Sequence, residues 1–185
     1  TGLANSLVIA DSLDTYLSIS AGAYHTCGIT TNNKIKCWGR NHNYETVPGN
    51  NSTTTYSTPQ FIDSGTNYQF ILASQISGKP VFAITSSGDL RTWGGANANI
   101  TSLDPGVNYT QVSSNGSSHC AITSVGVVRC WGSNLSGELA RTSGSSASLS
   151  IPANISDSAT AYSEVSVGEN HVCGKALATG FFKCW

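Results

Sequence analysis

One sequence pattern constrains this chain more than any other, because it occurs four times. The copies read AYHTCGITTNNKIKCWG, KPVFAITSSGDLRTWGG, SSHCAITSVGVVRCWGS and NHVCGKALATGFFKCW, and their tryptophans are Trp38, Trp93, Trp131 and Trp185. A unit of about 40 to 55 residues that recurs in this way predicts a repeat architecture, in which neighbouring units share their core. The pattern therefore directs attention to surfaces, edges and assembly rather than to one catalytic cleft.

Each copy predicts a short strand followed by a hairpin. A tyrosine stands three residues before a β-branched residue in every unit: Tyr16 and Ile19, Tyr68 and Ile71, Tyr109 and Val112, Tyr162 and Val165. The hairpin loops are expected at Thr31–Asn33, Ser86–Gly88 and Ser124–Gly126, with Gly180 in the fourth turn. The last residue of such a three-residue loop adopts a left-handed conformation, which Asn and Gly tolerate. No stretch shows helical periodicity, so the sequence predicts an all-β chain.

The six cysteines fall into three hairpin pairs, namely Cys27 with Cys37, Cys120 with Cys130, and Cys173 with Cys184. The second unit lacks both partners and carries Phe82 and Thr92 instead, and loss in pairs is what disulfides predict. Opposed hairpin residues have Cβ atoms about 4.5–5.5 Å apart, close to the range that a disulfide needs. The metal-binding alternative requires shorter spacings or clustered Cys and His, which are missing. Disulfides indicate an oxidising compartment.

The chain contains seven N-x-[ST] sequons, at Asn50, Asn51, Asn99, Asn108, Asn115, Asn134 and Asn154. Two interpretations compete: a glycosylated extracellular surface, or sequons that arise from a Ser- and Thr-rich composition. We expect N-linked glycans at several of them. Asn134 differs from the others, because the WGSN turn competes for its side chain.

Composition excludes several function classes. The net charge is −1 and only 10% of residues are charged, so no basic patch is available to bind nucleic acid. No apolar run reaches the length of a membrane span. The sequence has no phosphate-binding loop, zinc motif or Ser-His-Asp arrangement, and we expect neither a cofactor, a metal nor catalytic residues.

Three groups of residues still invite a functional interpretation. The histidines His25, His119 and His171 could be ligands or bases, but we expect each to hydrogen-bond a neighbouring turn. The four recurring tyrosines could form a sugar-binding platform, although one per unit favours packing. Asp63 and Asp157, and by the same pattern Asp11, recur at equivalent turns and are expected to cap them.

Three segments carry a resemblance to a known family. AGAYHTCGITTNNKIKCWGRN, SNGSSHCAITSVGVVRCWGSNL and VSVGENHVCGKALATGFFKCW resemble repeats of the regulator-of-chromosome-condensation family. The resemblance implies β-propeller blades, and it places Pro59 and Pro152 where the next strand begins. The added Cys pair is similar to the secreted branch, which includes extracellular bacterial and algal repeats and crinkly-type receptor ectodomains. The second unit departs most from the signature, and we expect its blade to be less regular.

The resemblance implies that residues 1–185 form one domain, which consists of several repeat units. The expected units are the tail of a blade at about 1–15, then 16–66, 67–107, 108–160, and a truncated unit at 161–185. Either the sequence belongs to a longer chain, or Leu3–Leu13 completes the last blade. Donation within the chain would close a small ring, whereas donation to the next subunit would propagate head to tail.

These features favour a non-enzymatic extracellular glycoprotein that acts as a structural or interaction scaffold. In one version of this expectation it is a subunit of a surface filament completed by strand exchange. Its expected partners are other protein chains, including copies of itself, and N-linked glycans. One alternative is a receptor-like ectodomain that binds a peptide or glycan on a propeller face, and another is a propeller that binds an enzyme.

Overall fold

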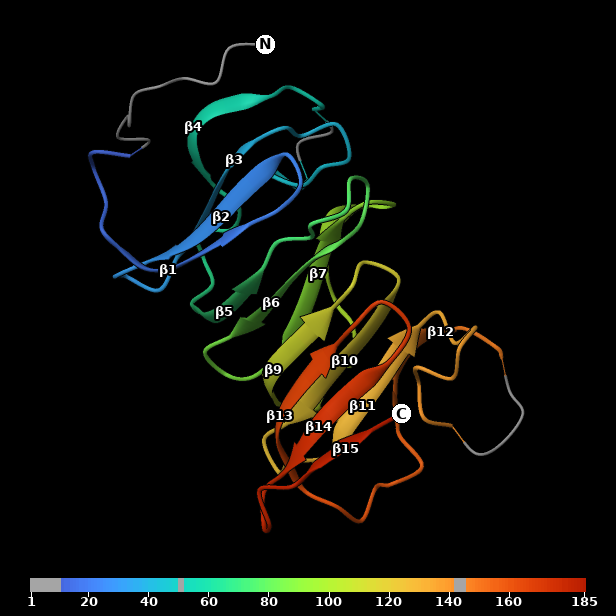
Figure 1. Ribbon diagram of the computed structural model, residues 1–185. Coiled ribbons are helices and arrows are strands. Elements are labelled where there is room, and N and C mark those ends of the chain that lie inside the picture. The colour runs from blue at the N-terminus through green and yellow to red at the C-terminus, as the bar shows by residue number, and fades with distance from the viewer. Residues whose placement is uncertain (1–10, 50–51, 142–145) are drawn as a thin grey trace, which may run out of the picture.

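The computed structural model describes residues 11–49, 52–141 and 146–185. These residues form four antiparallel sheets, which follow one another along an arc from the blue first sheet to the red fourth sheet in Figure 1. The all-β architecture of propeller blades is confirmed. Most of the expected donor segment, residues 3–10, and the sequons at Asn50 and Asn51 lie outside the described residues.

Each sheet is a meander whose strands pair in chain order. The first sheet contains β1 (Tyr16–Ala21), β2 (His25–Thr30), β3 (Ile35–Gly39) and β4 (Tyr56–Phe61). The second contains β5 (Tyr68–Leu72), β6 (Val81–Thr85), β7 (Leu90–Gly94) and β8 (Asn97–Ser102). The third contains β9 (Tyr109–Ser114), β10 (Ser118–Thr123), β11 (Val128–Gly132) and β12 (Leu149–Asn154), and the fourth contains β13 (Tyr162–Val167), β14 (Val172–Ala176) and β15 (Phe182–Cys184).

The three-residue hairpin loops form as the sequence predicts. Asn33, Gly88 and Gly126 have φ angles of 59°, 95° and 85°, in the left-handed region. The carbonyl of each of these residues accepts a 2.8 Å hydrogen bond from the backbone N–H of the tyrosine that opens the next sheet. The loop residue therefore joins two blades as well as closing a turn.

A shared apolar core lies between each pair of consecutive sheets. Ile29 and Ile35 of the first sheet pack with Tyr68 and Ile71 of the second, and all four are buried. The same positions recur at the next two junctions, as Ile84 and Leu90 with Tyr109 and Val112, and as Ile122 and Val128 with Tyr162 and Val165. Full burial of one such aliphatic side chain stabilises the fold by about 1.5–3 kcal/mol. Each blade thus covers the core of the blade before it.

The expectation that Pro59 and Pro152 begin their strands is wrong. The outer strands β4 and β12 begin at Tyr56 and Leu149, so Pro59 and Pro152 lie inside them rather than at their starts. Proline is tolerated there because an edge strand leaves its outward N–H groups without sheet partners.

The sequence predicts a less regular second blade, but the second sheet has four strands, as the first and third have. Phe82 pairs with Thr92 in the register that the cysteines occupy elsewhere. Phe82 packs in the core, and the Thr92 hydroxyl donates to the carbonyl of Val81 at 2.9 Å. Apolar contact and a hydrogen bond therefore take the place of the disulfide.

Candidate interaction surfaces

Each blade contains a carboxylate that accepts a hydrogen bond from the recurring tyrosine and from a basic side chain. The four sets are Asp11 with Tyr16 and Lys36, Asp63 with Tyr68 and Arg91, Asp104 with Tyr109 and Arg129, and Asp157 with Tyr162 and Lys183. In the first set the Tyr16 hydroxyl lies 2.7 Å and the Lys36 amine 2.9 Å from Asp11 Oδ2. The aspartates stand just before the inner strand, so each set fixes the connection that leads into its blade.

The pKa values of these groups follow from their contacts. Hydrogen bonds from Lys183, Thr160 and Tyr162 lower the pKa of Asp157 to about 2. Hydrogen bonds from Tyr16 and Lys36 also hold the pKa of Asp11 well below its ordinary value. Burial, together with neighbouring Asp63, raises the pKa of Tyr68 to about 12. At neutral pH the tyrosines in these sets are therefore hydrogen-bond donors, and Asp11 and Asp157 accept as carboxylates.

The tyrosine hydroxyls thus donate hydrogen bonds to aspartates within the blades, and the rings do not form a sugar-binding platform. Tyr68, Tyr109 and Tyr162 are buried. Sequence reasoning recognised Asp11, Asp63 and Asp157 but missed Asp104 and the four basic partners. Two signals were available: each aspartate precedes its tyrosine by five residues, and a Lys or Arg directly precedes each Cys or Thr of the second hairpin strand.

The histidines divide into two groups. His119 Nδ1 lies 2.7 Å from the Ser114 hydroxyl, which also accepts from Gly116 N–H, so this histidine does hold a turn. Burial lowers the pKa of His119 to about 4, which keeps the ring neutral. His25 instead packs against Gly22, and within the described ranges its buried Nε2 has no hydrogen-bond partner. The exposed ring of His171 lies against Gly168 in the same way, and the described residues offer it no hydrogen bond. The expectation is therefore wrong for His25 and His171.

The six cysteines are joined as Cys27–Cys37, Cys120–Cys130 and Cys173–Cys184, each with Cα atoms 4.1 Å apart. The first two disulfides are fully buried between blades. Cys184 is exposed at the surface of the fourth sheet.

The described sequon asparagines have two kinds of environment. Asn99, Asn108 and Asn154 are exposed. Asn115 uses both amide hydrogens, which it donates to the carbonyls of Gly168 at 2.8 Å and Glu169 at 2.9 Å. Asn134 is 2% exposed, and its Oδ1 accepts from Leu139 N–H at 2.8 Å.

The two ends of the arc expose positions that are buried at the three junctions. Ile19, the counterpart of buried Ile71, Val112 and Val165, is 68% exposed on β1 beside exposed Leu17. Phe182, the counterpart of buried Ile35, Leu90 and Val128, is 71% exposed on β15. We name these two surfaces the leading face (Leu17 and Ile19) and the trailing face (Lys175 and Phe182).

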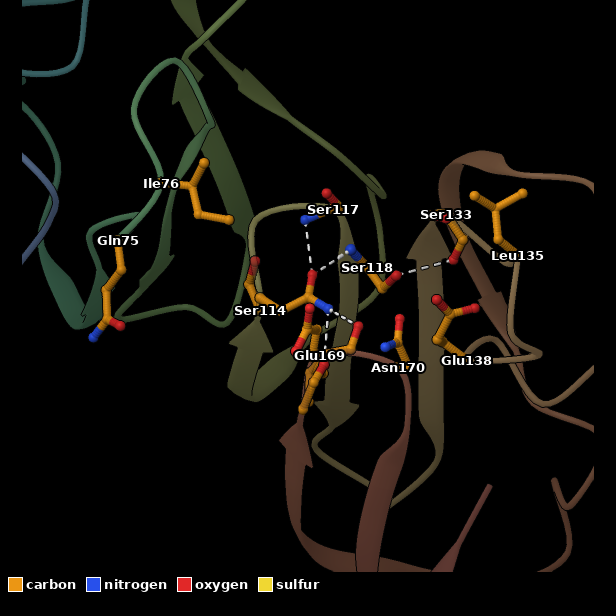
Figure 2. A pocket seen from close by; sticks show the side chains of 13 residues that line it. Gln75, Ile76, Ser114, Ser117, Ser118, Ser133, Leu135, Glu138, Glu169 and Asn170 are labelled. Atoms are coloured by element: carbon orange, nitrogen blue, oxygen red, sulfur yellow. Dashed lines mark hydrogen bonds between the residues drawn. The ribbon is translucent and has the colours of Figure 1, made fainter.

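A pocket of about 730 Å³ lies where loops of the second, third and fourth sheets meet. Figure 2 shows Gln75 and Ile76 on one side and Ser133, Leu135 and Glu138 on the other. Glu169 and Asn170 come from the fourth sheet. Across the described part of the chain, no group of three or more His, Cys, Asp or Glu side chains is placed to hold a metal ion, and no helix is long and apolar enough to span a membrane.

Comparison with known proteins finds one repeat model that matches part of this chain and several solved structures with a similar fold. Residues 17–45 match the regulator of chromosome condensation (RCC1) repeat. The structure resembles the crystal structure of human WBSCR16 with a TM-score of 0.77 at 16% identity, covering 92% of this chain and 46% of that one. It resembles yeast RCC1 (Prp20), crystallised with Kap60, with a TM-score of 0.72 at 17% identity, covering 92% and 43%.

A plant receptor shares the fold as well. The entire ectodomain of the Physcomitrella patens receptor kinase CR4 aligns with a TM-score of 0.61 at 16% identity, covering 93% of this chain and 41% of that one. This chain therefore spans less than half the length of each of these three structures. No curated protein sequence matches it.

Proposed function

Because this chain is built of regulator-of-chromosome-condensation-type propeller repeats, we propose that it is a non-enzymatic extracellular scaffold that binds other protein chains through its blades. The fold supports an interaction module. We also propose that this module is secreted, glycosylated and able to self-assemble.

An extracellular location is supported by the three disulfides, since such bonds persist mainly in oxidising compartments. Three exposed sequons offer positions for N-linked glycans. The fold is shared with a plant receptor ectodomain. The low net charge of −1 argues against nucleic acid as a partner.

The absence of catalysis is proposed from what the candidate groups do. The recurring aspartates accept hydrogen bonds from tyrosines and basic side chains. Ser114, the hydroxyl beside His119, accepts a hydrogen bond from the turn that it closes. These groups therefore hold turns and connections within their own blades.

The observation that carries the proposal is the pair of end faces. At three internal junctions the same two positions meet and are buried. At the ends they are exposed, as Ile19 on the leading face and Phe182 on the trailing face. Because the same two surfaces pack against each other at three junctions, each end face is suited to bind another repeat blade. We propose that this blade belongs to a second copy of the chain, packed head to tail.

Strand exchange would reinforce this contact. The fourth sheet has three strands in the described residues, whereas the other sheets have four. A strand added beside β15 would gain backbone hydrogen bonds. Because the contact joins two different surfaces, it would propagate into a filament unless it closed into a ring.

Electron microscopy of the purified glycosylated protein tests self-assembly. We expect filaments or closed rings, in which the leading face of one copy meets the trailing face of the next. Discrete monomers at all concentrations would remove the self-assembly part of the proposal and leave binding to other proteins.

The alternative is a receptor-like ectodomain that binds a peptide or glycan on one propeller face. The observation that favours it is the pocket between the second, third and fourth sheets, together with the fold shared with CR4.

A further inference from the structure

We propose that this pocket binds the basic side chain, Lys or Arg, of a partner protein, with Glu138 as the group that recognises it. The inference rests on the proposed interaction function and gives the partner a chemical identity.

The chain contains two copies of the loop that carries Glu138, and the copies differ at one informative position. In the first loop Glu45 accepts from Asn43 twice, from the backbone N–H to Oε2 at 2.8 Å and from the side-chain amide to Oε1 at 2.9 Å. In the third-sheet loop Ser136 replaces that asparagine, and its N–H donates to Glu138 Oε2 at 2.9 Å. Serine lacks the amide that would reach Oε1.

The carboxylate of Glu138 is therefore only partly satisfied by the protein. The residue is 3% exposed and lines the pocket. Ser136 provides the single hydrogen bond that the described residues donate to its side chain. Glu138 lines the pocket, so its second carboxylate oxygen can accept from a ligand there, and a cationic donor makes the strongest hydrogen bond to a carboxylate.

The loop that presents Glu138 is held in place before any ligand binds. Trp185 Nε1 donates to the carbonyl of Glu138 at 2.9 Å, and Leu139 N–H donates to Asn134 Oδ1 at 2.8 Å. A fixed carboxylate loses less conformational freedom on binding than a mobile one.

The rest of the pocket suits a cation on an aliphatic stem. A second carboxylate, Glu169, lies in the same lining, and none of the lining residues is basic. Ile76 and Leu135 are exposed apolar side chains in the lining, where they can contact the methylene groups of Lys or Arg.

N-linked glycans are not expected at the pocket. Asn115 lines it and Asn134 lies in its loop, yet both side chains are committed to structural hydrogen bonds. Exposed Asn108 and Asn154 instead lie beside the hairpin loop at Ser124 and Val125. The pocket is thus on a surface that a protein partner can reach.

A pair of capped peptides tests the proposal, one with arginine at the centre of Gly-Gly-Arg-Gly-Gly and one with neutral citrulline in its place. In ¹H–¹⁵N NMR titrations we expect the arginine peptide to shift amide signals of residues 133–139 and 167–170, and the citrulline peptide to leave them in place. Glu138→Gln should weaken binding roughly tenfold to a hundredfold, the range for a charged hydrogen bond.

Ser136→Asn is the more specific variant, because the new amide should donate a hydrogen bond to Glu138 Oε1, as Asn43 does to Glu45 in the first loop. The variant should keep the charge and the fold. We expect it to weaken the arginine peptide as much as Glu138→Gln, with an unchanged melting temperature. Glu164→Gln, which removes an exposed charge outside the pocket, should leave affinity unchanged.

Equal binding of the two peptides, no amide shifts, or unchanged affinity in both Glu138→Gln and Ser136→Asn would overturn the pocket assignment. Those results, obtained on a protein that still self-associates, leave the scaffold function standing. A protein that takes the arginine peptide but stays monomeric contradicts self-assembly and not the pocket.

Discussion

The most repeated unit at the residue scale is the aspartate that accepts from a tyrosine and a basic side chain. It occurs in all four blades, although the basic residue is Lys in two and Arg in two. Turn capping was predictable for Asp63, because its Oδ1 accepts from Gly65 N–H two residues on. The basic partners were not predicted, because they stand more than 20 residues away along the chain and meet the aspartate only after the hairpin has folded.

Removal of one such carboxylate should weaken the fold at neutral pH and much less in acid. Because hydrogen bonding lowers the folded pKa of Asp157 to about 2 from 3.8, its stabilisation is complete above about pH 4 and is lost as the pH falls toward 2. Asp157→Asn should therefore lower the urea midpoint at pH 7, and the difference from wild type should shrink at pH 2.5. Exposed Glu169→Gln serves as control, and an equal difference at both pH values contradicts this assignment.

Sequon occupancy should follow the environment of each asparagine. A glycan takes the place of one amide hydrogen, so Asn115, which donates both, would lose a hydrogen bond to Gly168 or Glu169. Buried Asn134 has no room for a sugar. Mass spectrometry of secreted protein should find glycans at Asn99, Asn108 and Asn154, and glycans at Asn115 or Asn134 on folded protein would contradict the account.

At the scale of elements, the sequence predicted the hairpins and their loops well. Asn33, Gly88 and Gly126 signalled the turns through their tolerance of positive φ. The outer strands were harder to place, because their edge position allows proline inside them and weakens the sequence signal. The pocket lay beyond prediction, since it brings together Gln75, Glu138 and Glu169 from three different blades.

The three disulfides should differ in their resistance to reduction. Those of the first and third blades are buried under the next blade, whereas Cys184 of the fourth blade is exposed. Under limiting reductant, we expect Cys173 and Cys184 of monomeric protein to be alkylated first, as measured by peptide mass spectrometry. Equal rates for all three pairs would show that the blades do not shield their disulfides.

Removal of a buried disulfide should lower the free energy of unfolding. Replacing Cys120 and Cys130 together by alanine opens a hairpin loop of sequence separation 10, and such a loop contributes about 2–3 kcal/mol on the chain-entropy account. Urea unfolding of the double variant measures this. A cost near zero would indicate that the third blade needs no disulfide, like the second blade, where Phe82 packs in the core and Thr92 donates a hydrogen bond.

At the scale of the whole molecule, the repeat has two complementary sides, and both are exposed at the ends of the arc. Ile19 and Phe182 stand at positions that other blades bury completely or nearly so. The recurrence of a β-branched residue three positions after each tyrosine was visible in the sequence. The exposure of one copy, Ile19, could not be predicted, because it depends on which blade packs against that residue.

Sedimentation velocity tests the central claim, that the end faces of the scaffold bind further repeat blades, most directly. We expect wild-type protein to associate with rising concentration, and Ile19→Asp or Phe182→Asp each to weaken association tenfold or more, since each removes about 1.5–3 kcal/mol of apolar burial. Val125→Asp, at an exposed hairpin loop, should associate like wild type. A wild-type protein that stays monomeric throughout, or face variants that associate as well as it does, would contradict the account.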